Sequence, residues 1–180
     1  QRILADRAAK SAPQAQLVTL DNFLADPHLD ALYNALTSTA PVLDAKAEAA
    51  AKEQIEWGLH QADIIKISDE EVDFLWGLSP QESAQKLLTE YGASLVYVTL
   101  GPKGCYFANR NCTGEIASPA EIHVVDTTGA GDIFGGSAMS RFLKLNKAPA
   151  DLTKKELTAI TTFACCAASL STQKHGGITS

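Results

Sequence analysis

The segment Val124 to Gly136 (VVDTTGAGDIFGG) combines a glycine-rich turn with a carboxylate at the predicted start of a helix. Such a turn directs unpaired backbone amides and the positive end of the helix dipole at one point, and glycines let an anion approach the main chain. The dipole stabilises a carboxylate in the first helical turn, so Asp132 is expected to be ionised at neutral pH and to accept a proton. This spacing predicts phosphoryl transfer to an alcohol, with an anion hole at Gly129, Ala130 and Gly131.

Other interpretations of the same residues stay open. Asp132 can be an ordinary first-turn carboxylate, and the glycines can form an ordinary tight turn. Gly129, Gly131 and Gly135 also approximate the GxGxxG pattern of dinucleotide-binding proteins. That pattern fits poorly, because the third glycine comes one residue late and the next element is predicted to be a helix rather than a strand. No GxxxxGK[ST] loop occurs in the chain.

The elements that position the turn follow from hydrophobic periodicity. We expect a strand at Glu121 to Val125 before the turn and a helix from Ile133 after it. Helices are also expected to begin at Asp69 and at Ser79, the second with a capping-box pattern and a proline at its first position. The remaining predictions are strands at 15–20, 41–43, 62–67 and 94–100, helices at 27–37 and 45–60, a hairpin at 104–118, and a last helix opened by the capping box at 153–156.

Strands that alternate with helices and are apolar throughout predict a mostly parallel sheet covered on both faces, which is an α/β fold. Ligands of such sheets bind beyond the carboxyl ends of the strands. Ser68, Gly101 and Asp126 each follow a predicted strand. We therefore expect the candidate site residues to meet at one edge of the sheet. The length of 180 residues suggests a single domain.

Composition narrows the class of function. The chain is 46% hydrophobic and 20% charged, and 15 basic against 21 acidic residues give a net charge of −6. This balance, without a basic run, argues against nucleic-acid and membrane-surface binding. We expect a cytoplasmic protein, because no stretch has transmembrane length and the N-terminus lacks a secretory signal. The four cysteines form no CxxC pair, and Cys165 and Cys166, in an alanine-rich helix, are expected to be buried thiols rather than ligands. Cys105 and Cys112 flank the predicted hairpin tip and could meet across it, but we expect this pair to be reduced.

The motif DTTGAGDIFGG resembles the second signature of the PfkB, or ribokinase-like, carbohydrate kinases. The segments ADIIKISDEE (62–71), VTLGPKG (98–104) and STQKHGG (171–177) follow the order of that family. Residues 52–180 are similar to the C-terminal, ATP-binding half of a fructokinase-like member. The resemblance implies a ribokinase-like three-layer αβα sandwich and ATP-dependent phosphorylation of a sugar hydroxyl. A kinase of a nucleoside or other small alcohol, and a non-catalytic nucleotide-binding or scaffold protein, are the alternatives.

The resemblance also implies a nucleotide and magnesium site. Ser68, Thr99, Gly101 and Gly104 match positions that line the nucleotide, although a glycine-rich turn after a strand can equally be a plain turn. Ser68 and Glu71 match a family pair, usually asparagine and glutamate, that orders Mg²⁺ through water near the phosphates. Serine replaces asparagine here, as in many fructokinase-like members. The alternative is a capping box, since Ser68 precedes a predicted helix and Glu71 lies three residues on.

A monovalent-cation site is a further implication. In cation-activated relatives, the matching positions surround K⁺ chiefly through backbone carbonyls. An ion there would brace the predicted anion-binding turn DTTGAGD at 126–132, here called the phosphate turn. The positions here are Asp126, Thr128, Ser171, Lys174, Gly176 and Ser180. An ordinary loop after a helix is the alternative, with Lys174 and His175 as cations near a helix C-terminus.

The other half of a complete relative is not recognisable in this chain. Residues 1–44 contain no GG-containing signature, no recognisable sugar-contacting residues and no β-sheet lid. At 41–44, PVLD stands where fructokinases usually carry a DPN motif and a basic residue. We therefore expect residues 1–180 to form one partial ribokinase-like domain that lacks the substrate and lid region. Its expected partner is a small-molecule sugar, with no nucleic acid or membrane, and a homodimer is expected if a lid region exists.

Overall fold

The computed structural model describes residues 45–176 of the chain. The elements in chain order are α4 (Ala45–Leu59), β1 (Ile64–Ser68), α5 (Asp69–Trp76), α6 (Pro80–Thr89), β2 (Leu95–Thr99), the 3₁₀ turn η1 (Gly101–Lys103), β3 (Cys105–Asn109), β4 (Thr113–Ile116), α7 (Ala130–Leu143), the 3₁₀ turn η2 (Pro149–Asp151) and α8 (Lys154–Ser171). The strands predicted at 15–20 and 41–43 and the helix predicted at 27–37 lie outside the described residues.

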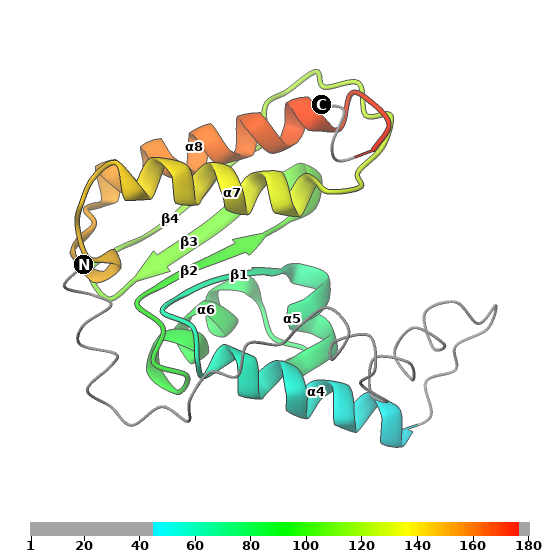
Figure 1. Ribbon diagram of the computed structural model, residues 1–180, viewed down its shortest axis with the longest axis vertical. Coiled ribbons are helices and arrows are strands. Elements are labelled where there is room, and N and C mark those ends of the chain that lie inside the picture. Colours follow the sequence, from blue (N-terminus) through cyan, green and yellow to red (C-terminus); the bar gives the residue numbers. More distant parts are fainter. Residues whose placement is uncertain (1–44, 177–180) are drawn as a thin grey trace, which may run out of the picture. The chain divides into compact units, whose positions relative to one another are not determined.

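The described strands form one sheet in the order β1-β2-β3-β4 (Figure 1). β1 and β2 run parallel and are connected through α5 and α6, with Ser68 paired to Thr99. β2, β3 and β4 are antiparallel neighbours joined by short turns, as the predicted hairpin requires. The α/β character is confirmed. Within residues 45–176, parallel pairing is confined to β1 and β2.

Helices cover both faces of this sheet (Figure 1). α7 and α8 lie side by side on one face, and α5 and α6 lie on the other. Successive residues of β2 point to opposite faces: Val96 and Val98 pack with the α5–α6 layer, and Leu95 and Tyr97 pack with the α7–α8 layer. The described residues thus have the three layers of the predicted αβα sandwich.

Local sequence signals fix where several helices begin. Ser79 caps α6 through the amide of Glu82, and Pro80 stands at the first helical position. A reciprocal bond from the backbone of Ser79 to the Glu82 carboxylate completes the capping box, with a length of 3.0 Å. This start is confirmed as predicted.

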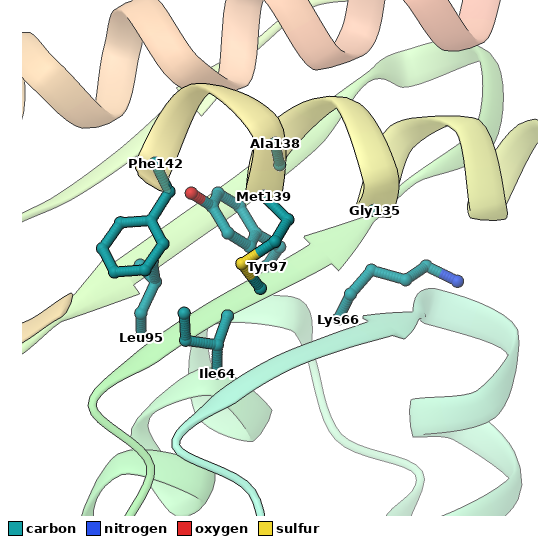
Figure 2. A pocket seen from close by; sticks show the side chains of 8 residues that line it. All are labelled: Ile64, Lys66, Leu95, Tyr97, Gly135, Ala138, Met139 and Phe142. Atoms are coloured by element: carbon teal, nitrogen blue, oxygen red, sulfur yellow. The ribbon is translucent and has the colours of Figure 1, made fainter. Parts of the chain in front are cut away.

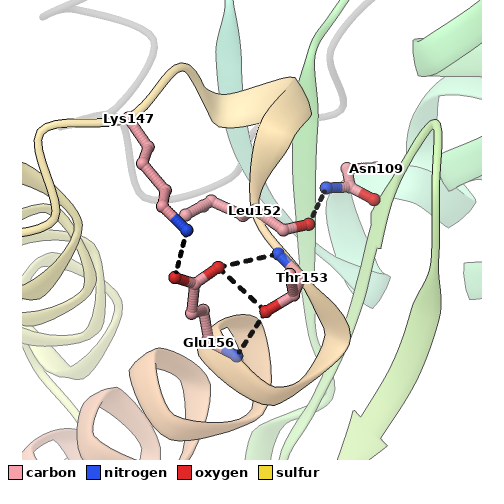
Figure 3. Close-up of polar contacts among 5 residues, drawn as sticks. All are labelled: Asn109, Lys147, Leu152, Thr153 and Glu156. Atoms are coloured by element: carbon pink, nitrogen blue, oxygen red, sulfur yellow. Dashed lines mark hydrogen bonds and ion pairs between the residues drawn. The ribbon is translucent and has the colours of Figure 1, made fainter.

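The N-terminus of α8 is closed by a larger polar network (Figure 3). The Glu156 carboxylate accepts hydrogen bonds from Lys147 Nζ at 2.6 Å and from the backbone amide of Thr153 at 2.9 Å. These contacts, the lysine first, lower the pKa of Glu156 to about 2. Asn109 Nδ2, from the end of β3, donates to the carbonyl of Leu152 at 2.9 Å. The network therefore ties the start of α8 to the sheet.

The strand predicted at Glu121 to Val125 is wrong. This segment is irregular, and Glu121 has a left-handed backbone with φ 65°. The amides of Val125 and Asp126 both donate to the carbonyl of Thr172, at 2.8 and 3.0 Å. Because the segment after α8 satisfies these amides, the apolar run leads into the phosphate turn without joining the sheet.

All four cysteines are free thiols, as expected. Cys105 and Cys165 are buried in the α7–α8 layer, whereas Cys112 is half-buried and its thiol lies 3.4 Å from Asn109 Oδ1. Burial raises the pKa of the Cys165 thiol to about 11. In the part of the chain that the structure describes, no helix has both the length and the apolar character needed to span a membrane.

Candidate active site

The phosphate turn begins α7 with unsatisfied backbone amides. Gly129 has φ 77° and is the N-cap residue, a conformation that favours glycine. No side chain caps this helix, and the Ala130 amide donates to Thr127 at 3.1 Å. Among the described residues, the amides of Gly131 and Asp132 have no hydrogen-bond partner. α7 therefore presents two free donors at the positive end of its dipole, where an anion is stabilised.

A cavity of about 610 Å³ lies beside this turn. It is bounded by the carboxyl ends of β1 and β2, the β2–β3 turn, the segment that leads to α7, and the C-terminal part of α8. The predicted site residues that line it are Ser68, Thr99, Gly101, Gly104, Ala130 and Gly131. Segments far apart in the sequence thus bring the predicted nucleotide residues and the phosphate turn to one place.

Asp132 and Gly129 flank this cavity without lining it. Asp132 lies in the first turn of α7, its side chain is exposed, and it makes no hydrogen bond or ion pair within residues 45–176. A carboxylate in this position is accessible to a hydroxyl group brought next to the anion turn. The role of Asp132 as a base remains a prediction.

The β2–β3 turn requires its second glycine. Gly104 has φ 112°, and a Cβ built there would lie 1.9 Å from the carbonyl oxygen of Ile116. The amide of Leu100 donates to the carbonyl of Gly104 at 2.8 Å and closes the turn. Close packing of the backbone against Ile116 therefore explains why residue 104 is glycine, and the same packing places this residue beside the cavity.

Ser68 and Glu71 form the capping box that was the alternative to the metal site. Ser68 Oγ accepts from the Glu71 amide at 3.1 Å, and Glu71 Oε2 accepts from the Ser68 amide at 2.7 Å. Glu71 is thus engaged at the start of α5, while Ser68 also lines the cavity. The described residues contain no cluster of three or more His, Cys, Asp or Glu side chains suited to a metal ion. A water-mediated role of Glu71 toward Mg²⁺ stays a prediction.

The predicted cation segments meet through Asp126. Its carboxylate accepts from the amides of Gly176 and Thr128, each at 2.9 Å. These two contacts, Gly176 first, lower the pKa of Asp126 to about 2. Ser171 is buried at the end of α8 and Lys174 is exposed in the turn that follows. Ser180 lies outside the described residues, and the cation site stays a prediction.

Several cavity residues escaped the sequence analysis. The apolar ones include Pro119, Ile122, Val124, Phe134, Cys165 and Ala168, and the polar ones include Lys66, Ser118, Ser169 and Thr172. Their contribution depends on how α8 and the segment before α7 pack over the turn, which no local motif encodes. Lys66 stands inside the recognised segment ADIIKISDEE, and its charge was the available signal.

Residues 5–180 match the family model described as pfkB family carbohydrate kinase, and the chain belongs to this family. It is 35% identical over 130 residues to fructokinase-2 of Solanum habrochaites, covering 71% of this chain and 38% of that protein.

Two solved structures show the same fold. Aminoimidazole riboside kinase from Salmonella enterica, complexed with aminoimidazole riboside and an ATP analogue, matches with a TM-score of 0.61 and 26% identity, over 72% of this chain and 42% of that one. A double-mutant fructokinase from Vibrio cholerae O395, bound to fructose, ADP and a potassium ion, matches with a TM-score of 0.61 and 28% identity, over 71% and 40%. The fold is therefore ribokinase-like, and the chain spans about two fifths of the length of these relatives.

Proposed function

We propose that this chain carries the nucleotide-binding and catalytic part of an ATP-dependent sugar kinase of fructokinase type. The observation that carries the proposal is the uncapped start of α7: the free amides of Gly131 and Asp132 stand beside a cavity shared with Ser68, Thr99 and Gly101. Preorganised amides that bind a phosphoryl group stabilise the charge that develops during transfer. Membership of the carbohydrate kinase family supports this assignment.

The chemistry divides among the chain's own residues. The amides at the start of α7 bind the phosphate oxygens, and the turn at Gly101 and Gly104 holds the nucleotide close to the backbone. Asp132 takes the proton of the sugar hydroxyl as that oxygen attacks the terminal phosphorus. ATP would supply the phosphoryl group, and Mg²⁺ would offset the charge of its phosphates. Glu71 would approach the ion only through water, because its carboxylate also accepts the hydrogen bond of the Ser68 amide in the capping box. A potassium ion held by carbonyls near Asp126 would brace the turn, and the double-mutant fructokinase of Vibrio cholerae was solved with a potassium ion bound.

A kinase of a nucleoside is the second candidate. The similarity to the aminoimidazole riboside kinase favours it, because that enzyme was solved with a nucleoside-like ligand and an ATP analogue. Both candidates use the same nucleotide cavity and the same base. They differ in the acceptor alone.

We also infer that the enzyme is cytoplasmic and that it forms a homodimer if its full length includes a lid.

Calorimetry and thermal scans with Mg-ATP test the nucleotide assignment. A ligand that binds only the folded chain stabilises it by about 2.7 kcal/mol at a hundred times its Kd. We expect a rise in Tm with millimolar Mg-ATP and none with Mg²⁺ alone. A folded sample whose Tm and heat signal do not respond to ATP contradicts the proposal. At the full length of the native protein, phosphorylation of fructose against aminoimidazole riboside then decides between the two acceptors.

A further inference from the structure

Lys66 lies between two cavities. It lines the candidate nucleotide cavity and also a smaller one of about 220 Å³, whose other walls are mainly apolar residues of β1, β2 and α7. Figure 2 shows the Lys66 side chain directed away from Ile64, Leu95 and Phe142 of the smaller cavity. The ammonium group is therefore not part of that apolar cluster and lies on the side of the candidate nucleotide cavity.

The ammonium group of Lys66 lies close to the phosphate turn. A Cβ built on Gly131 would lie 3.0 Å from Lys66 Nζ and 3.6 Å from Lys66 Cε. Within residues 45–176, Lys66 makes no hydrogen bond and no ion pair, although Asp69 and Glu70 border the same cavity. A lysine that is accessible and unpaired here is free to contact a ligand.

This arrangement places like charges together. The free amides of Gly131 and Asp132 form the positive end of the α7 dipole, and a cation beside a helix N-terminus is unfavourable. An anion bound at the turn converts that repulsion into attraction from two sides. Glycine at 131 leaves room for the ammonium. A doubly or triply charged phosphate group bound there would therefore be attracted by both the turn and the lysine.

We propose that Lys66 is a catalytic residue that contacts the terminal phosphoryl group of bound ATP, an inference that rests on the proposed function. In the transfer step, the bond from the acceptor oxygen to the terminal phosphorus forms and the bond to the ADP oxygen breaks. The acceptor proton moves to Asp132 and ADP leaves with the bonding electron pair. Lys66 takes no part in the proton transfer and stabilises the negative charge on the phosphoryl oxygens, as a fixed cation does in other phosphoryl transfers.

Nucleotide affinities distinguish this role from a structural one. Lys66→Met keeps an unbranched side chain that is one atom shorter and removes its charge. Lys144→Met, at the other end of α7, removes the same charge away from the cavity. Each variant is titrated with a non-hydrolysable ATP analogue and with ADP, both with Mg²⁺. A lost charge-assisted hydrogen bond weakens binding by about tenfold to a hundredfold. We expect that loss for the ATP analogue with Lys66→Met alone, ADP affinity within twofold of the parent, and recovery in Lys66→Arg.

The outcomes separate this proposal from the function on which it rests. If the parent binds both nucleotides but Lys66→Met weakens neither, or both equally, the contact to the terminal phosphate is overturned and the nucleotide site stands. If the folded parent binds neither nucleotide, both proposals fail.

Gly131→Ala gives an independent check of the geometry. The added methyl group would displace the ammonium, whose position at the end of a flexible chain makes the change inexpensive for the fold. We expect Gly131→Ala to weaken the ATP analogue in the parent and to have a much smaller effect in the Lys66→Met background, because contacting residues are not additive. Equal losses in the two backgrounds would mean that the methyl group acts without Lys66, and would overturn the proposed contact.

Discussion

The two ends of the α7–α8 pair each carry a carboxylate with a pKa of about 2, but the two carboxylates are held in different ways. The Glu156 carboxylate accepts hydrogen bonds from Lys147 Nζ and from the backbone amide of Thr153, so it closes the helix N-terminus beside which it lies (Figure 3). The Asp126 carboxylate accepts hydrogen bonds from the backbone amides of Thr128 and Gly176, both of which lie in loops. It fixes the path of the chain into α7 and leaves the first amides of that helix free.

We interpret this difference as separating an end that stabilises the fold from an end that is proposed to bind a ligand. At the start of α8, the Glu156 carboxylate is hydrogen-bonded to both Lys147 and Thr153. Asn109, which donates to the carbonyl of Leu152, is only 3% exposed. At the start of α7, glycines and free amides face a cavity that Lys66 also lines. Donors without partners are costly when buried and useful when a ligand supplies the acceptor. We therefore expect substitutions at the α8 end to change stability and substitutions at the α7 end to change binding and turnover.

The largest expected effect belongs to Asp132, the proposed base at the α7 end. In the native protein at full length, Asp132→Asn should lower single-turnover phosphorylation of the sugar by about a hundredfold to ten-thousandfold, because it removes the proton acceptor. Mg-ATP affinity and Tm should stay close to those of the parent. Asp151→Asn, an exposed carboxylate at the other end, is the matched control. Turnover within a few fold of the parent would exclude Asp132 as the base.

A pair of substitutions tests the separation of stability from binding. Thr153→Ala removes a helix cap and should lower the free energy of unfolding by about 1 kcal/mol, with unchanged nucleotide affinity. Asp126→Asn should weaken Mg-ATP binding by about threefold to tenfold, because the loop that positions the turn loses a charged acceptor. Denaturant titration and calorimetry on both variants provide the comparison. The distinction between the two ends fails if Thr153→Ala weakens nucleotide binding as much as Asp126→Asn does.

Potassium should act at the α7 end alone. If carbonyls near Asp126, Thr128 and the segment after α8 enclose the ion, Mg-ATP should bind more tightly in K⁺ than in tetramethylammonium at the same ionic strength. Asp126→Asn should reduce this difference, whereas Thr153→Ala should keep it. Equal affinities of the parent in the two buffers would remove the cation from the proposed mechanism.

Acid should affect both ends in the same pH window. The pKa values of Asp126 and Glu156 are about 2 in the folded chain, and ordinary unfolded values are near 4. The unfolded chain then binds more protons, so the stabilisation is complete above about pH 4 and is lost as pH falls toward 2. Glu156→Gln should flatten the decline of Tm between pH 4 and pH 2. An unchanged slope would show that this carboxylate does not contribute to acid sensitivity.

Local signals predicted much of the fold because they act within a few residues. The capping boxes at Ser79 and Thr153 determine helix starts by neighbouring hydrogen bonds, and both are present. The strand expected at Glu121 to Val125 failed because Thr172, far along the chain, satisfies its amides.

The candidate site divides in the same way. Its glycine turn was visible as a motif, and Gly129 does cap α7 with a left-handed backbone. The approach of Lys66 to Gly131 was not visible, because it depends on how β1 and α7 pack across the sheet face.

Hydrogen exchange with and without Mg-ATP tests the central claim most directly, that the uncapped start of α7 binds the phosphates of a nucleotide. Amides that gain an acceptor exchange more slowly, so we expect protection at 129–133 and around the β2–β3 turn at 99–104. The start of α8 at 153–156, already closed by its own cap, should be unchanged. The claim would be contradicted if saturating Mg-ATP protects other segments but leaves the amides of Gly131 and Asp132 exchanging at the rate they have without nucleotide.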